Sequence, residues 1–204
     1  MGGIDLKREL ADLYKAPRKP VMVDVPSLRY AMVDGTGNPN DNEWFQEATG
    51  ALYAVSYTLK FKLKKGPSAL NYVVMPLQGL WWAEDMEVFV MDAREEWLWT
   101  LMILQPEEVT PEMFNDACQE VLDKKGLEAV NELRLEEYHE GPSAQVMHLG
   151  PYAEEAPTIA MLHEYIEDSG RVPRGKHHEI YLGDPRRTAP ERLKTILRQP
   201  VGEP

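Results

Sequence analysis

Cysteine, long apolar runs and net positive charge are all scarce in this sequence of 204 residues. A single cysteine, Cys118, excludes an intramolecular disulfide framework. No apolar run approaches the roughly 20 residues that a helix needs to span a bilayer, so we expect no membrane partner. The 34 acidic residues outnumber the 22 basic ones and leave a net charge of −12. Because phosphate binding needs a positive surface, we also expect no nucleic-acid partner.

Motifs for metal, cofactor and covalent chemistry are missing as well. The five histidines lack the paired spacing of a zinc site, and the adjacent His177 and His178 would point apart on a strand. The glycines of "GTGNPN" complete neither a P-loop nor a dinucleotide-binding motif, and no GxSxG is present. We therefore expect no metal and no cofactor. The N-terminal "MGGIDLKREL" lacks the apolar core of a signal peptide, which predicts a cytoplasmic protein.

Hydrophobic periodicity predicts alternating helices and strands along the whole chain. Residues 41–65 form the longest expected helix, where Asp41 or Asn42 can cap the start and Gly50 hints at close packing. Cys118 lies on the apolar face of another expected helix and is interpreted as a core residue. The other expected elements are helices at 6–14, 110–125 and 154–168, a strand pair or one bent strand at 21–37, strands at 71–77, 86–91, 97–104 and 193–200, and a strand that closes on a turn within 177–185.

The second half of the chain repeats the first in outline. "VPSLRYAMVDGTG" is echoed by "GPSAQVMHLGPY", and "WTLMILQP" by "LKTILRQP", in the shared order strand, helix, strand, strand. This predicts an α+β fold of duplicated βαββ units with pseudo-twofold symmetry, antiparallel sheets flanked by helices and a central ligand cleft. The expected divisions are a helical lead-in at 1–20 and one domain at 21–204, with repeats at about 21–106 and 132–201 and a connecting helix at about 107–126.

The stretch "HHEIYLGDP" carries the main candidate site. Alternation in a strand places His177, Glu179 and Tyr181 on one face, and His178 and Ile180 on the other. Glu179 either faces water or forms the base of a pocket between the repeats. In a pocket it could neutralise a cationic ligand, orient water or act as a base. Tyr181 is either a packing residue or a hydrogen-bond donor and acid.

Aromatic residues that could line such a pocket are plentiful. The candidates are Trp81 and Trp82 in "GLWWAED", Trp99 in "WLW", and Tyr152 in the turn after the second repeat's first strand. Adjacent Trp81 and Trp82 diverge on a strand, so at most one of them faces a given pocket. Aromatic walls with a carboxylate favour flat, hydrophobic or cationic compounds.

Several segments together resemble the GyrI-like small-molecule-binding proteins, which are relatives of the effector-binding domains of AraC-type and MerR-type regulators. The segments are "LKRELADLYKAP", "VDGTGNPND", "MPLQGLWW", "WLWTLMILQP", "HLGPYAEE" and "HHEIYLGDPRRTAPERLKTILRQP", which span about Leu6 to Val201. The resemblance implies a duplicated βαββ fold with an aromatic cleft that binds hydrophobic, often cationic compounds. It places the family's acidic residue at Glu179, with Tyr181 two residues later.

The stand-alone branch of the family includes hydrolases of cyclopropanoid DNA-alkylating toxins. For such chemistry the resemblance assigns Glu179 to activating or orienting water, and Tyr181, together with Tyr152, to hydrogen-bonding the substrate carbonyl. The alternative is a non-catalytic protein that presents an acidic surface to a protein partner, as a gyrase inhibitor or regulatory partner would. The sequence contains no DNA-binding segment, so we do not expect direct control of transcription, and it does not indicate an oligomeric state.

Overall fold

The computed structural model describes residues 4–67, 69–83 and 94–204. The expected strand at 86–91 lies outside these residues. The helices are α1 (Leu6–Glu9), α2 (Ala11–Tyr14), α3 (Glu43–Lys65), α5 (Pro111–Lys125) and α6 (Ala156–Asp168), with short 3-10 turns η1 (Arg94–Glu96), η2 (Glu128–Glu132), η3 (Tyr152–Glu154) and η4 (Pro190–Arg192). The strands are β1 (Val21–Thr36), β2 (Leu77–Trp82), β3 (Leu98–Leu104), β4 (Arg134–Leu149), β5 (Val172–Pro173), β6 (His177–Tyr181) and β7 (Lys194–Gly202).

Six antiparallel strands curve into a closed barrel. Their order is β4-β1-β3-β2-β6-β7, and pairing between β4 and β7 joins the two ends, while β5 adds to β7 outside the ring. Closure satisfies the hydrogen-bonding groups that would otherwise lie along an open sheet edge. β2 and β6 are hydrogen-bonded neighbours in the barrel wall, so a strand from the first half of the sequence meets a strand from the second half there.

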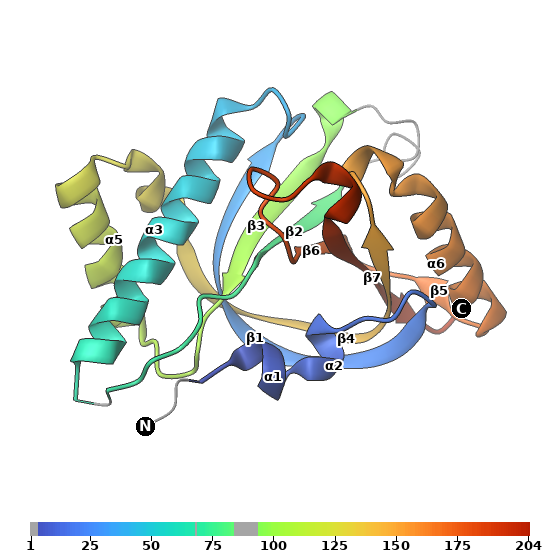
Figure 1. Cartoon of the computed structure of the whole chain (residues 1–204), viewed down its shortest axis with the longest axis horizontal. Coiled ribbons are helices and arrows are strands. Elements are labelled where there is room, and N and C mark those ends of the chain that lie inside the picture. The colour runs from blue at the N-terminus through green and yellow to red at the C-terminus, as the bar shows by residue number, and fades with distance from the viewer. Residues whose placement is uncertain (1–3, 68, 84–93) are drawn as a thin grey trace.

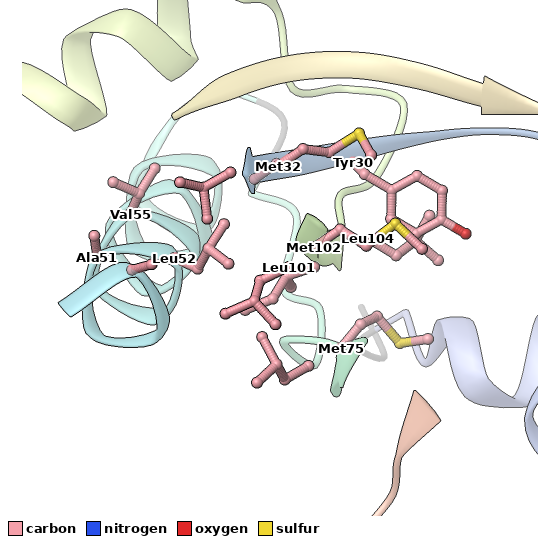
Figure 2. Packing of buried hydrophobic residues seen from close by; sticks show 14 of the residues in the cluster. Tyr30, Met32, Ala51, Leu52, Val55, Met75, Leu101, Met102 and Leu104 are labelled. Carbon is pink, nitrogen blue, oxygen red and sulfur yellow. The ribbon is translucent and has the colours of Figure 1, made fainter. Parts of the chain in front are cut away.

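Helices cover the outside of the barrel on two sides (Figure 1). The buried face of α3, including Leu52 and Val55, packs against Leu101 of β3 (Figure 2). α6 covers the opposite side, where Leu162 and Ile166 join a separate apolar cluster with residues of β4 and β7. α5 packs on α3 rather than on the barrel. Among the helices of the described residues, none is long and apolar enough to cross a membrane.

A polar network fills part of the barrel interior. Nη1 of Arg198 donates to Oε2 of Glu140 (3.1 Å), and Nδ1 of His178 lies 3.0 Å from both oxygens of that carboxylate. Nη2 of Arg198 also donates to the carbonyl of Leu13 in α2 (2.7 Å). The side chains of Glu140, His178 and Arg198 are all within 2% of complete burial. The network therefore holds α2 against one end of the barrel.

Most of the elements expected from the sequence are present, with three differences. Asn42 caps α3 by accepting from the backbone N–H of Phe45, and Gly126 ends α5 in a left-handed conformation. The expected strand at 71–77 is wrong, because regular pairing begins only at Leu77 and continues through the two tryptophans of β2. The expected helix at 6–14 is broken into α1 and α2, and the one at 154–168 begins at Ala156.

Cys118 packs against the core as expected, although it is only partly buried. Burial raises the pKa of its thiol to about 11, so the thiol stays protonated at neutral pH. A protonated thiol is a weak nucleophile, which agrees with a packing role rather than a catalytic one.

Gly35 and Gly50 form a matched pair for a stability test. A Cβ at Gly35 would lie 2.0 Å from Cη2 of Trp99, whereas a Cβ at Gly50 would meet nothing within 4 Å. The expectation of close packing at Gly50 is therefore wrong. We expect Gly35→Ala to lower the free energy of unfolding by about 1–3 kcal/mol through overpacking, and Gly50→Ala to raise it by about 0.5–1 kcal/mol through helix propensity. Urea denaturation of both variants measures this, and equal effects would contradict the packing of Trp99 over Gly35.

Candidate functional site

Glu179 lies on the outer face of the barrel wall, between α3 and α6. In the β6–β7 register it is opposite Leu197, which packs in the apolar cluster beneath α6. In the β2–β6 register it is opposite Gly79, which in turn is opposite the α3-facing Leu101 of β3. Directly paired residues share a face of a sheet, so Glu179 faces the strip of β2 and β6 between the two helices.

Three side chains form a hydrogen-bonded chain at this place. The hydroxyl of Tyr181 donates to Oε2 of Glu179 (2.8 Å), and Nε1 of Trp81 donates to the oxygen of that hydroxyl (3.0 Å). The Glu179 side chain is 14% exposed. Burial, and then the nearby Glu179 carboxylate, raise the pKa of Tyr181 well above its ordinary value. Tyr181 thus stays protonated and orients the carboxylate.

Gly79 leaves space for these three hydrogen-bonded side chains. A Cβ there would lie 2.6 Å from Nε1 of Trp81 and 3.1 Å from the hydroxyl oxygen of Tyr181. Glycine inside a strand often marks such a close approach of another group. Any other residue at position 79 would displace the indole or the phenol, so Gly79 belongs to the site.

Aromatic rings lie on two sides of these three hydrogen-bonded side chains. Phe45 of α3 stacks on Trp81 with ring centroids 6.1 Å apart. Tyr152 of η3 meets Tyr181 edge to face, with centroids 5.5 Å apart. Burial raises the pKa of Tyr152 to about 12, with further upward effects from Glu155 and Glu179. The Tyr152 hydroxyl is therefore a hydrogen-bond donor at neutral pH, and this residue is 38% exposed.

The structure brings together four of the six residues singled out from the sequence. Tyr181 contacts each of the other three, Glu179, Trp81 and Tyr152. Trp99 is the direct partner of Trp81 in the β2–β3 register but is fully buried, and Trp82 lies on the other face of β2.

Trp82 points to the opposite face of β2 from Trp81, where Nζ of Lys176 lies 3.3 Å from its ring centroid. Trp99 is fully buried beneath Phe45, whose ring meets it edge to face at 5.2 Å. Trp99 can therefore support the aromatic wall from behind, but presents no exposed surface.

Sequence reasoning missed two polar residues of this region. His177 is 3% exposed, and its Nε2 lies 3.5 Å from Oε1 of Glu179. Glu155 is 5% exposed and contributes to the raised pKa of both Tyr152 and Tyr181. The strand alternation already placed His177 beside Glu179, whereas nothing local marks Glu155 as buried.

These features define an α+β protein with a small barrel and a carboxylate set among aromatic side chains on the barrel's outer face. The model of the GyrI-like small molecule binding domain matches residues 18–201. The chain belongs to this family. No curated protein gives a significant match to the chain.

Solved structures of similar proteins agree with this assignment. An uncharacterized conserved protein from Listeria innocua is 39% identical, with a TM-score of 0.88, and the match covers 98% of this chain and all of that one. A structure from the same organism that is described as a hydrolase has the same identity and coverage and a TM-score of 0.86. The C-terminal domain of EcmrR is 10% identical, with a TM-score of 0.55 over 91% of this chain and 98% of that domain, and so is similar in fold alone.

Proposed function

We propose that this protein binds hydrophobic, aromatic or cationic small molecules at Glu179 and hydrolyses those that carry a strained, electrophilic cyclopropane ring. The observation that carries the proposal is the Glu179 carboxylate, held by Tyr181 and enclosed by Trp81 and Tyr152. A largely desolvated carboxylate attracts cations, and aromatic faces stack on flat or cationic compounds. The hydrolase among the 39% identical structures supports the catalytic part.

In the proposed reaction Glu179 directs a water molecule to the ring carbon. The water oxygen forms a bond to that carbon, the strained carbon–carbon bond breaks, and its electron pair moves to the conjugated carbonyl oxygen of the substrate. Glu179 receives one proton of the water and then passes it, through solvent, to the carbonyl oxygen, so that one water is added overall and the carboxylate is regenerated. Since the Tyr181 hydroxyl already donates its hydrogen bond to Glu179, we assign the hydrogen bond to the substrate carbonyl oxygen to Tyr152.

Ligand entry requires a movement of side chains, because Trp81 is only 3% exposed and Glu179 is mostly covered. We assign this movement to Tyr152, which lies on a short 3-10 turn and is the most exposed of the aromatic residues at the site. Displacing its ring would uncover Tyr181 and the carboxylate. The ligand would then occupy a cleft between α3 and α6.

We further propose that the chain consists of two βαββ units, placed after a lead-in at 1–20 and related by pseudo-twofold symmetry. The order β1, α3, β2, β3 in one half and β4, α6, β6, β7 in the other supports this proposal, if the two-residue β5 is left aside. The proposed cleft then lies where β2 of one unit pairs with β6 of the other. Glu179 breaks the symmetry, because only the second unit supplies the acid.

Tryptophan fluorescence tests the binding part of the proposal. Titration with tetraphenylphosphonium, a neutral polyaromatic compound and a cyclopropanoid compound is expected to quench the emission saturably. Trp81→Phe should remove much of the signal and weaken binding roughly fivefold, since aromatic pairs contribute about 1 kcal/mol. Trp82→Phe is the matched control on the opposite face of β2 and should retain both. Absence of quenching by every compound, with stable capture of a protein partner, would support the interaction-protein alternative.

A further inference from the structure

Building on the proposed cation binding at Glu179, we propose that His177 is a positioning residue that fixes the Glu179 carboxylate and sets the net charge of the site. Both residues lie on one face of β6, with Nε2 of His177 3.5 Å from Oε1 of Glu179. Tyr181 holds the other carboxylate oxygen from two residues further along the strand. One carboxylate oxygen therefore accepts a hydrogen bond from Tyr181, and the other lies within ion-pair distance of His177 on the same strand.

Burial gives this contact its electrostatic weight. His177 is 3% exposed and the Glu179 side chain 14%, so little water separates or screens the two groups. An imidazole changes charge within the range of pH 5 to 8. The buried Glu155 acts on Tyr152 and Tyr181 of the same site as a further acidic group. A neutral His177 leaves the negative charge of Glu179 uncompensated, whereas a protonated His177 offsets it. A bound cation should consequently be held more weakly when His177 is protonated.

The groups around His177 limit how much positive charge can collect there. His163 of α6 lies close enough for the charge of His177 to lower its pKa, after the larger effect of burial, while Glu167 of the same helix acts in the opposite direction. Trp81, opposite His177 on β2, is uncharged. His178 lies behind the strand and is held neutral by burial, which lowers its pKa. The two histidines on the outer face thus resist double protonation.

His177, Glu179 and His163 could also be considered as metal ligands, but their geometry does not support a metal site. Within residues 4–67, 69–83 and 94–204, no group of three or more His, Cys, Asp or Glu side chains could hold a metal ion. In the same part of the chain, Nε2 of His163 is buried without a hydrogen-bond partner.

Histidine side-chain NMR tests the coupling without any ligand. At a fixed pH we expect the imidazole signals of His177 to shift in Glu179→Gln, because the variant removes the carboxylate that lies 3.5 Å from its Nε2. His139, which is exposed on β4, is the internal control and its signals should not move. Unchanged imidazole signals of His177 would overturn the inference, whether or not the protein binds small molecules.

The consequence for binding is tested with tetraphenylphosphonium, whose charge does not depend on pH. From pH 8 to pH 5 we expect its affinity for the unmodified protein to fall severalfold more than its affinity for His177→Gln. The neutral triphenylphosphine oxide is expected to lose little affinity in either protein. Identical pH profiles of the two proteins for the cation would overturn the inference.

Should circular dichroism show that His177→Gln does not fold, the NMR experiment on Glu179→Gln decides. Coupling by NMR without binding of any compound would instead remove the proposed function.

Discussion

Glu179→Gln is expected to lower the rate of cyclopropane hydrolysis at least about 100-fold, while a neutral aromatic compound still binds within a few-fold of the original affinity. The amide is almost isosteric and its oxygen can still accept from the Tyr181 hydroxyl, so the local structure should persist. It cannot, however, take a proton from water, and such proton transfer contributes about 10²–10⁴ to rates. Mass spectrometry of the product, which gains one water, measures the turnover.

The same variant separates charge from shape in binding. A permanent cation should lose about tenfold in affinity, or 1.4 kcal/mol, with the loss of the negative charge. Glu164→Gln makes the same change of charge at an exposed position of α6 and is the matched control. Unchanged turnover in Glu179→Gln would remove this residue from the reaction. Unchanged cation affinity would remove its charge from recognition.

The candidate site could be predicted from the sequence as far as local periodicity reaches. The two-residue repeat of a strand was enough to place Glu179 and Tyr181 on one face and to separate Trp81 from Trp82. Periodicity does not reveal which strand becomes the neighbour. The approach of Trp81 to Tyr181 spans 100 positions and depends on β2 pairing with β6. Gly79 becomes meaningful only once that pairing is known.

Burial of polar residues was the part that the sequence concealed. Alternation places His178 on the same face as Ile180 but does not show that it contacts Glu140, which is 38 positions away. Glu140 precedes Gly141, which has a positive φ in the middle of the long strand β4. Whether an acid at such a position faces water or the interior depends on the curvature of the whole sheet. The alternation of residues in one strand does not predict that curvature.

The buried network makes Arg198 the residue whose loss should affect stability most. Arg198→Met is expected to lower the free energy of unfolding by about 3–5 kcal/mol, because Glu140 would keep a buried charge without its cation. The variant also breaks the link to Leu13, so α2 should detach from the end of the barrel. Urea denaturation, with hydrogen exchange at residues of α2, measures both effects. Arg187→Met is the control, since that side chain is 87% exposed.

The pH dependence of stability distinguishes a lost charge pair from a mere loss of packing. Burial alone would raise the pKa of Glu140, but His178 and Arg198 hold it at about 2, below its ordinary 4.5. Burial lowers the pKa of His178, so at neutral pH Arg198 is the cation that compensates the Glu140 carboxylate. The contribution of the ionised Glu140 is complete above pH 4.5 and is lost as the pH falls toward 2. Without Arg198 the carboxylate should take up its proton at a higher pH, so the stability of Arg198→Met should rise relative to that of the unmodified protein as the medium is acidified.

Adding Glu140→Gln to Arg198→Met should restore part of the stability at pH 7. If the double variant is as unstable as the single one, packing rather than the uncompensated carboxylate sets the cost.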